Sequence, residues 1–126
     1  MIAEALIALT LALPQAPKPQ HFDRTTWSLI AADASVRALD VYSTHQMLHR
    51  GYHELILPKA VANSTPAMIG YSAGCVVVNA LIARTLIRHK HRRMADLYLA
   101  GDAAEDGMFA VRNLTLRKLK AGEVVK

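Results

Sequence analysis

The chain has 126 residues, with 15 Lys and Arg against 10 Asp and Glu, so its formal net charge is +5. This length allows one domain and excludes a two-domain enzyme. Hydrophobic residues make up 52% of the chain and charged residues 20%, a composition that excludes an intrinsically disordered protein. The single cysteine, Cys75, excludes an internal disulfide framework and a zinc cluster built on cysteines. The composition therefore describes one folded and rather apolar unit.

Residues 1–16 contain an apolar stretch, Ala5–Leu13, that is much shorter than the roughly 20 residues a membrane-spanning helix needs. It resembles the core of an export signal, with Pro14 and Ala16 in a small-residue cleavage region, but no Lys or Arg precedes it. A cleaved signal and an uncleaved apolar tail both remain open. Residues 17–24 form a Pro-rich linker in either case.

The next segment is predicted to be a helix that begins near Thr25 or Thr26, both acceptable N-caps, and ends near Arg50, before Gly51. Nearly all of its circumference is apolar, whereas a surface helix of a soluble protein is mostly polar. Its polar residues recur at spacings of four, three and four and so share one narrow stripe. We call this stripe the polar seam: Asp33, Arg37, Asp40 and Thr44.

A polar seam on an apolar helix indicates lipid around the helix and partner helices on one side. Charges at the centre of a lone spanning helix cost about 2.5–3.5 kcal/mol each. Pairing of Arg37 with Asp33 and with Asp40 would remove much of this cost, and so would a second helix facing the seam. The seam therefore predicts a helix that enters a membrane only together with other helices.

A connector over residues 51–66 precedes the clearest membrane signal in the chain. From Ala67 to Ile87 the only charged residue is Arg84, and a basic cluster over residues 88–93 follows directly. This pattern is typical of a spanning helix whose C-terminal side stays in the cytoplasm. The alternative is a buried core helix of a soluble bundle. The basic cluster has no interleaved aromatic residue, so it favours anionic lipid headgroups over nucleic acid.

Residues 94–119 are again helical in pattern, with an apolar side and a polar side. We expect either a third span whose acidic side meets the polar seam or a helix lying along the membrane interface. The helical membrane domain is thus predicted over residues 25–120, followed by a polar tail over 121–126. The polar side comprises Asp102, Glu105, Asp106, Arg112 and Asn113, of which Asp102 and Asp106 are predicted members of the polar seam.

Gly70 and Gly74 flank Ser72 in a G-x-S-x-G pattern, but a serine hydrolase also needs a strand before the serine and an acid and a histidine after it. Pro66 leaves no room for the strand, so catalysis is not expected. The two glycines also form a GxxxG pattern, which lets membrane helices approach closely. We therefore predict a helix-packing role for Gly70 and Gly74, with Asn79 as an interhelical hydrogen-bonding residue.

His45 and His49 lie one helical turn apart, a spacing that can hold a metal ion. Histidines near a membrane edge are more often interfacial residues, so no metal and no cofactor is predicted, and the pair stays the alternative site. Together with the carboxylates of the polar seam, it would suit an ion- or metal-handling membrane protein.

The pattern Asp40-x-x-Ser43-Thr44, then Gly51-x-x-Glu54 and Pro58, followed by an apolar span and a helix with Asn113, resembles a group of small uncharacterised bacterial membrane proteins. This resemblance implies a multi-span helical protein of the bacterial inner membrane and implies no activity. The sequence as a whole predicts a small all-α membrane protein with two or three membrane-associated helices. Its expected role is that of an accessory or scaffolding subunit that packs against itself or against a larger membrane partner.

Overall fold

The computed structural model describes residues 21–53 and 56–116, and this part of the chain is all-α with four helices. Three of them are long: α2 (Arg24–His49), α4 (Thr65–Arg88) and α5 (Arg92–Thr115). The fourth, α3 (Lys59–Ala62), is a single turn between α2 and α4. The predicted signal or apolar tail, residues 17–20 of the linker and the polar tail lie outside the described residues.

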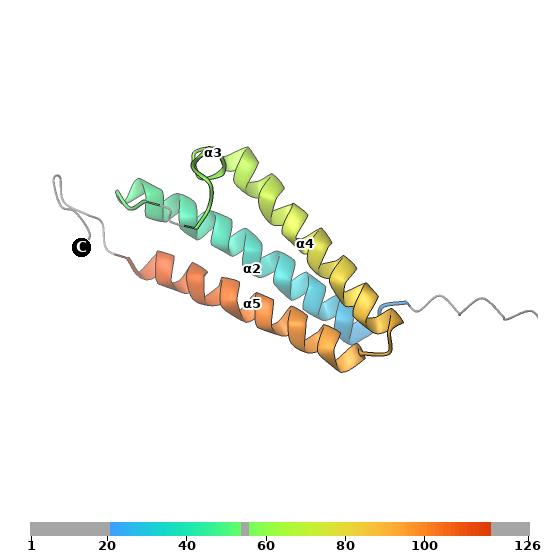
Figure 1. Ribbon diagram of the computed structural model, residues 1–126. Coiled ribbons are helices and arrows are strands. Elements are labelled where there is room, and N and C mark those ends of the chain that lie inside the picture. The colour runs from blue at the N-terminus through green and yellow to red at the C-terminus, as the bar shows by residue number, and fades with distance from the viewer. Residues whose placement is uncertain (1–20, 54–55, 117–126) are drawn as a thin grey trace, which may run out of the picture.

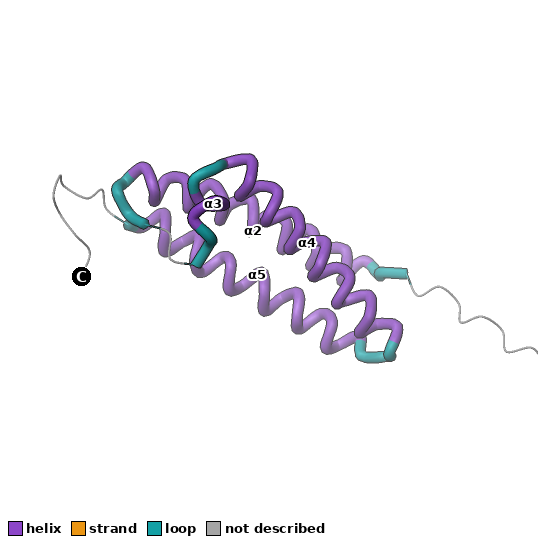
Figure 2. The backbone as a smooth tube through the Cα atoms, turned by 45° about the horizontal axis from the view of Figure 1, so that its top comes forward, coloured by secondary structure: helices purple, strands orange, loops and turns teal. Residues whose placement is uncertain are grey.

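The three long helices form one bundle (Figures 1 and 2). The polypeptide runs in the same direction in α2 and α5 and in the opposite direction in α4, so that the start of α2 lies at the same end as the α4–α5 turn. Near this end, α4 lies close to α2, and it diverges from α2 toward α3. The divergence leaves a groove between the two helices, which is described below.

Local signals in the sequence account for the helix ends. Asp23, and not the expected Thr25 or Thr26, is the N-cap of α2: its carboxylate accepts a hydrogen bond of 2.9 Å from the backbone N–H of Thr26. The helix ends at His49, and Gly51 follows with a φ of 95°, a left-handed conformation that glycine adopts without strain.

The second long helix, α4, matches the predicted apolar span and extends it by two residues at the start and one at the end. Ser64 is its N-cap and accepts a hydrogen bond from the N–H of Ala67, while Pro66 lies in the first turn, where no backbone N–H is needed. By length and composition, α4 is the one described helix that could cross a membrane, and only 17% of its apolar window is buried.

The bundle interior is layered along its length. An apolar core lies near the α4–α5 turn, where Ile30 of α2 packs with four residues of α4 and α5: Ala83, Ile87, Ala95 and Leu99. Beyond this core, toward the middle of the bundle, the interior becomes polar. Large apolar side chains lie on the outside instead, with Leu97 73% and Met108 74% exposed on α5. The outer surface is thus more apolar than the middle of the interior.

Candidate functional site

The middle of the bundle holds a cluster of charged and amide side chains contributed by all three long helices. We call it the central cluster: Asp33, Arg37, Asn79, Tyr98, Asp102 and Asp106. Arg37 lies at its centre. Its Nε atom is 3.0 Å from Oδ1 of Asp33, one turn earlier on α2, and its Nη2 atom forms ion pairs with Asp102 and Asp106 on α5. One guanidinium therefore ties α2 to α5 through two carboxylates.

Asn79 brings α4 into the same cluster. Its amide nitrogen donates to Asp33, at 3.2 Å, and to Asp102, at 2.7 Å, while its amide oxygen accepts from the hydroxyl of Tyr98 at 2.6 Å. Every long helix thus contributes at least one member, and the amide uses both its donor and its acceptor sides. Asn79, which the sequence predicted to form hydrogen bonds between helices, contacts both α2 and α5.

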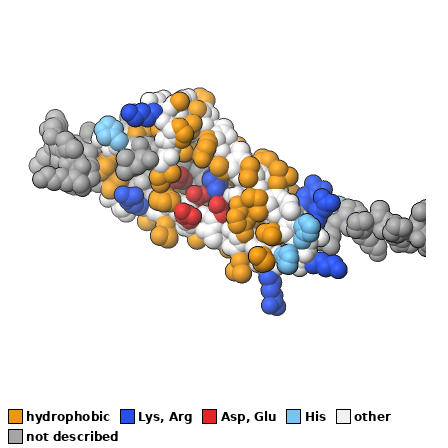
Figure 3. Space-filling model, in the orientation of Figure 1, with side chains coloured by type: hydrophobic (Ala, Val, Ile, Leu, Met, Phe, Trp, Pro, Cys, Tyr) orange, Lys and Arg blue, Asp and Glu red, His pale blue; other side chains and the backbone are white. Residues whose placement is uncertain are grey.

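The central cluster is only partly enclosed. The side chain of Asp33 is 1% exposed, whereas those of Arg37, Asp102 and Asp106 are 13%, 25% and 19% exposed. Figure 3 shows acidic side chains and one basic side chain gathered at the centre of one face, framed by hydrophobic side chains, with basic and histidine side chains at the right-hand end. A polar centre with an apolar surround is the reverse of a soluble bundle.

Two smaller polar contacts join α2 to α5 on either side of the central cluster. Toward the α4–α5 turn, the hydroxyl of Thr26 lies between two carboxylates, 2.9 Å from that of Asp23 and 3.1 Å from that of Asp96 on α5, and can donate to either. Toward the other end, the amide of Asn113 contacts the hydroxyls of Ser43 and Thr44 at 3.4 and 3.3 Å. Together with the central cluster, these contacts pair polar side chains of the two parallel helices at three successive levels.

The end of the bundle away from the α4–α5 turn is closed by Arg50. Its Nη1 atom donates to the backbone carbonyls of three residues at the C-terminal end of α5: Asn113, Leu114 and Leu116. The last carbonyls of a helix have no partner within the helix and carry partial negative charge. Arg50 therefore caps α5 from the end of α2.

The structure brings some of the predicted polar seam together and separates other members. Asp33, Arg37, Asp102 and Asp106 meet in the central cluster, whereas Thr44 belongs to the contact with Asn113. The recorded contacts of Arg37 are with these three carboxylates, and the expected pair with Asp40 is not among them. Asp40 is half-buried, and its backbone carbonyl accepts a hydrogen bond from Ser43.

The polar side predicted for residues 94–119 is divided in the structure. Asp102, Asp106 and Asn113 face the interior, but Glu105 and Arg112 are exposed. Glu105 and Arg112 each directly precede an interior residue, and neighbouring residues of an α-helix point about 100° apart. The two predicted seam members of this helix, Asp102 and Asp106, therefore face α2, while Glu105 and Arg112 lie at the exposed edge of the polar side.

Gly70 and Gly74 lie exposed within α4, and no side chain or neighbouring helix of the described chain comes within 4 Å of a Cβ built at either position. Among the described helices they hold no two together, so their helix-packing role stays a prediction. The G-x-S-x-G pattern lies entirely within the helix. It is therefore not the strand–turn–helix elbow that a hydrolase needs.

His45 and His49 lie on successive turns of α2 with their ring centroids 4.4 Å apart. Among the described residues, however, the group of three or more possible metal ligands is a different one: Asp33, Asp102 and Asp106, whose oxygen atoms lie within 4.8 Å of one another. The sequence predicted these carboxylates on two helices and gave the meeting of their polar sides as one of two alternatives, but it did not predict that the three carboxylates would converge.

Comparisons with protein-family models, with curated proteins and with solved structures find no match for this chain.

Proposed function

We propose that this chain is a small integral membrane protein in which α2, α4 and α5 span the bilayer together, and that it serves as an accessory or scaffolding subunit. The observation that carries the proposal is the inverted distribution of side chains in the middle of the bundle, with the charged central cluster inside and many large apolar side chains outside. A bundle of this kind buries its charges against one another and presents hydrocarbon to lipid. In water the same bundle would expose an unusually large apolar surface.

Only α4 of the described helices is apolar enough to cross a membrane by itself, but all three long helices have the length to span it together. The three long helices have 26, 24 and 24 residues, or about 36–39 Å at 1.5 Å per residue, enough to cross a hydrocarbon core of about 30 Å. Arg37, Asn79 and Asp102 lie near the midpoints of their helices. The central cluster would then lie near the middle of the bilayer, where unpaired charges are most costly and paired ones are best shielded from water.

The charge at the α4–α5 end suggests the orientation. This end carries Arg24, Arg88, Lys90, Arg92 and Arg93, with only a short turn between the two helices. Short loops rich in Lys and Arg stay in the cytoplasm. We therefore place the α4–α5 turn on the cytoplasmic side, where its basic side chains would meet anionic headgroups.

The outer face of α5 supports a role as a subunit. Exposed residues recur along it at spacings of four, three, four and three, the repeat of a helix that packs against another helix. We call this row the α5 row: Leu97, Gly101, Ala104, Met108 and Val111. The residues in the middle of this row, Gly101 and Ala104, have small side chains, so a partner helix could approach the backbone closely. Beside it, near the midpoint of α5, the exposed carboxylate of Glu105 would be costly in lipid and would favour a partner that pairs with it.

The experiment that tests this proposal combines membrane extraction with cross-linking in mild detergent. We expect the full chain to stay in the membrane pellet after a carbonate wash, and to cross-link either to a second copy or to a larger membrane protein. Ala104→Phe, which fills the middle of the α5 row, should reduce the cross-linked species at least tenfold. Ala32→Phe, at an exposed position of α2 outside that row, is the matched control and should leave it unchanged.

Release of the chain by carbonate would contradict membrane insertion. Retention in the pellet with equal cross-linking for both phenylalanine variants would contradict the α5 row as the packing surface and leave the insertion in place. Membrane insertion and packing through the α5 row can therefore be rejected independently of each other.

A second candidate function is cation handling at the central cluster. It is favoured by the convergence of the three carboxylates of Asp33, Asp102 and Asp106 on one guanidinium, which leaves an excess of negative charge. Oxygen ligands of this kind suit Mg²⁺, Ca²⁺ or Mn²⁺. Titration calorimetry with Mn²⁺ tests it: binding that Asp106→Asn abolishes supports cation handling, and absence of binding by the intact protein rejects it. The alternative pair, His45 and His49, predicts instead that Zn²⁺ binds and that His49→Ala abolishes this binding.

A further inference from the structure

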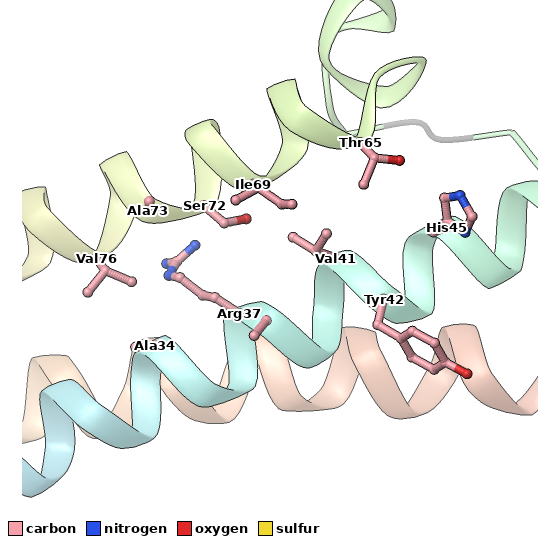
Figure 4. Close-up of a pocket in the computed structure, with 11 residues that line it drawn as sticks. Ala34, Arg37, Val41, Tyr42, His45, Thr65, Ile69, Ser72, Ala73 and Val76 are labelled. Carbon is pink, nitrogen blue, oxygen red and sulfur yellow. The ribbon is translucent and has the colours of Figure 1, made fainter.

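A groove of about 670 Å³ lies between α2 and α4, on the side where the two helices diverge (Figure 4). It is lined by residues 34–45 of α2 and residues 65–76 of α4. Its volume lies within the range of about 300–1,000 Å³ that is typical of small-molecule sites. It is thus the size of a ligand site rather than a gap between side chains.

Most of the groove wall is apolar. Ala34, Ala38 and Val41 line it from α2, and Ile69, Ala73 and Val76 line it from α4. Small and branched side chains on both walls suit a hydrocarbon chain, which needs apolar contact and no hydrogen bonds. The wall alone would therefore accept any apolar chain.

Five polar side chains interrupt this apolar wall. Tyr42, His45 and Thr65 lie toward the α3 end of the groove, whereas Arg37 of α2 and Ser72 of α4 lie farther from α3 and supply one hydrogen-bond donor from each helix (Figure 4). The guanidinium of Arg37 extends from α2 into the groove, near Ser72 and Val76 of α4 (Figure 4). The Nε and Nη2 atoms of this guanidinium contact the carboxylates of the central cluster. Within the described part of the chain, neither its Nη1 atom nor the hydroxyl of Ser72 donates a hydrogen bond. A donor left without a partner in an apolar medium costs free energy. A hydrogen-bond acceptor placed between the two donors would remove this free-energy cost.

The surroundings of Arg37 decide the charge of that acceptor. Behind the guanidinium lie the carboxylates of Asp33, Asp102 and Asp106, so the local excess of negative charge disfavours an anionic head group. A cationic head group entering the groove would meet the guanidinium first and be repelled. A neutral oxygen, such as that of a carbonyl, accepts from both donors without either penalty.

We infer that the groove between α2 and α4 is a binding site for a membrane-dissolved molecule with a long apolar chain and a neutral carbonyl oxygen, which accepts hydrogen bonds from Nη1 of Arg37 and the hydroxyl of Ser72. The inference rests on the proposed membrane insertion, because such a molecule reaches the groove from the lipid phase. It adds a ligand to the proposed subunit role.

The test uses the full chain in lipid nanodiscs and a photoactivatable long-chain ketone as the probe. Peptides that carry the label are identified by mass spectrometry. We expect labelling within residues 34–45 and 65–76, with competition by an unlabelled ketone of equal chain length. An alkane, a carboxylate and a quaternary ammonium compound of that length should compete at least tenfold more weakly, because none of them offers a neutral acceptor.

Two variants separate the polar contact from the apolar groove. Ser72→Ala removes one donor and should weaken competition by the ketone roughly three- to tenfold, with competition by the alkane unchanged. Ala38→Phe fills the groove and should abolish labelling of both segments. Ala32→Phe, on the same helix but outside the groove, should be labelled by the probe to the same extent as the unaltered protein.

Labelling spread evenly over the exposed apolar surface, equal competition by ketone and alkane, or full labelling of Ala38→Phe would each overturn the inference. So would cross-links that join residues 34–45 to a second copy, because the groove would then hold a helix. If the protein stays in the membrane after a carbonate wash but the ketone does not label the groove, the ligand site alone is rejected. Release by carbonate rejects membrane insertion and the ligand site together.

Discussion

Arg37 of α2 and Asp102 of α5 form an ion pair in the middle of the bundle, and Asn79 of α4 donates to the same carboxylate oxygen of Asp102 that the guanidinium contacts. A single carboxylate oxygen therefore joins all three long helices. Removal of either donor would leave Asp102 with one remaining partner. Replacement of Asp102 by an apolar residue would leave both donors short of an acceptor. The stability of the bundle should accordingly depend on this oxygen more than on the exposed charges.

Arg37→Gln should destabilise the protein strongly, because it leaves three neighbouring carboxylates without their cation. Breaking a buried ion pair by removing one partner typically costs about 3–5 kcal/mol. The loss should appear as lower accumulation in the membrane fraction and as a lower midpoint of thermal unfolding in detergent. Arg84→Gln, which removes an exposed arginine of α4, is the matched control and should change both quantities little.

The reciprocal change tests whether Arg37 acts through Asp102. Arg37→Asp combined with Asp102→Arg restores one opposite-charge pair between α2 and α5, so we expect the double variant to accumulate better than either single variant. A double variant that accumulates no better than the worse single one would contradict direct coupling between these two residues.

Asn79→Ala should also destabilise the bundle, since it removes donors to Asp33 and Asp102 and the acceptor of Tyr98. Leaving buried polar groups without partners costs about 1–3 kcal/mol. Val78→Ala, at an exposed neighbouring position, should stay within about 0.5 kcal/mol of the unaltered protein. Unfolding midpoints measured side by side in one detergent compare the two, and equal midpoints would show that the amide contributes nothing.

Much of the fold follows from local sequence patterns. The apolar run from Ala67 to Ile87 predicted α4 to within two residues at each end, because a long stretch of helix-forming apolar residues between Pro66 and a basic cluster leaves few alternatives. The end of α2 before Gly51 followed from the glycine alone. The start of α2 was missed because Asp23, Thr25 and Thr26 are all good caps, and only the hydrogen bond to Thr26 distinguishes among them.

The candidate site was less predictable, because it depends on how the helices pair. Spacing placed Asp33 and Arg37 on one stripe of α2 and predicted that Asp102 and Asp106 would meet this stripe, but it left open a last helix lying along the membrane interface. It did not predict the ion pairs of Arg37 with Asp102 and Asp106. Nor could it show that α4 would diverge from α2 and leave a groove that contains Ser72. Interhelical contacts arise from the packing of three faces at once, and a single sequence carries only the periodicity of each face.

Arg50→Gln should loosen the C-terminal end of α5 while leaving the middle of the bundle intact. The guanidinium donates to three carbonyls there, whereas the shorter neutral amide reaches fewer and loses the charge. Hydrogen exchange should therefore accelerate over the last turn of α5 and stay unchanged around Asp102. Lys59→Gln, on the exposed surface of α3, is the control. Unchanged exchange at the end of α5 would show that Arg50 does not cap the helix.

The N-cap of α2 predicts a dependence on pH at the α4–α5 end. The hydrogen bond from the backbone N–H of Thr26 is the main cause that lowers the pKa of Asp23 below its ordinary value of 3.8, with a further contribution from the Thr26 hydroxyl and a smaller one from Arg92. Because the pKa is lower in the folded state than in the unfolded state, the contribution of Asp23 to stability is complete above the ordinary value. It is lost as the pH falls through the lowered one.

Hydrogen exchange over the first turn of α2 should therefore accelerate as the pH falls below 3.8, after correction for the intrinsic exchange rate. Asp23→Asn keeps an oxygen that can cap the helix but does not titrate in this range, so its first turn should show no such acceleration. Asp23→Ala lacks the cap and should exchange fast at every pH. If Asp23→Asn retained the acceleration of the unaltered protein, another group would be responsible and the carboxylate of Asp23 would not control the start of α2.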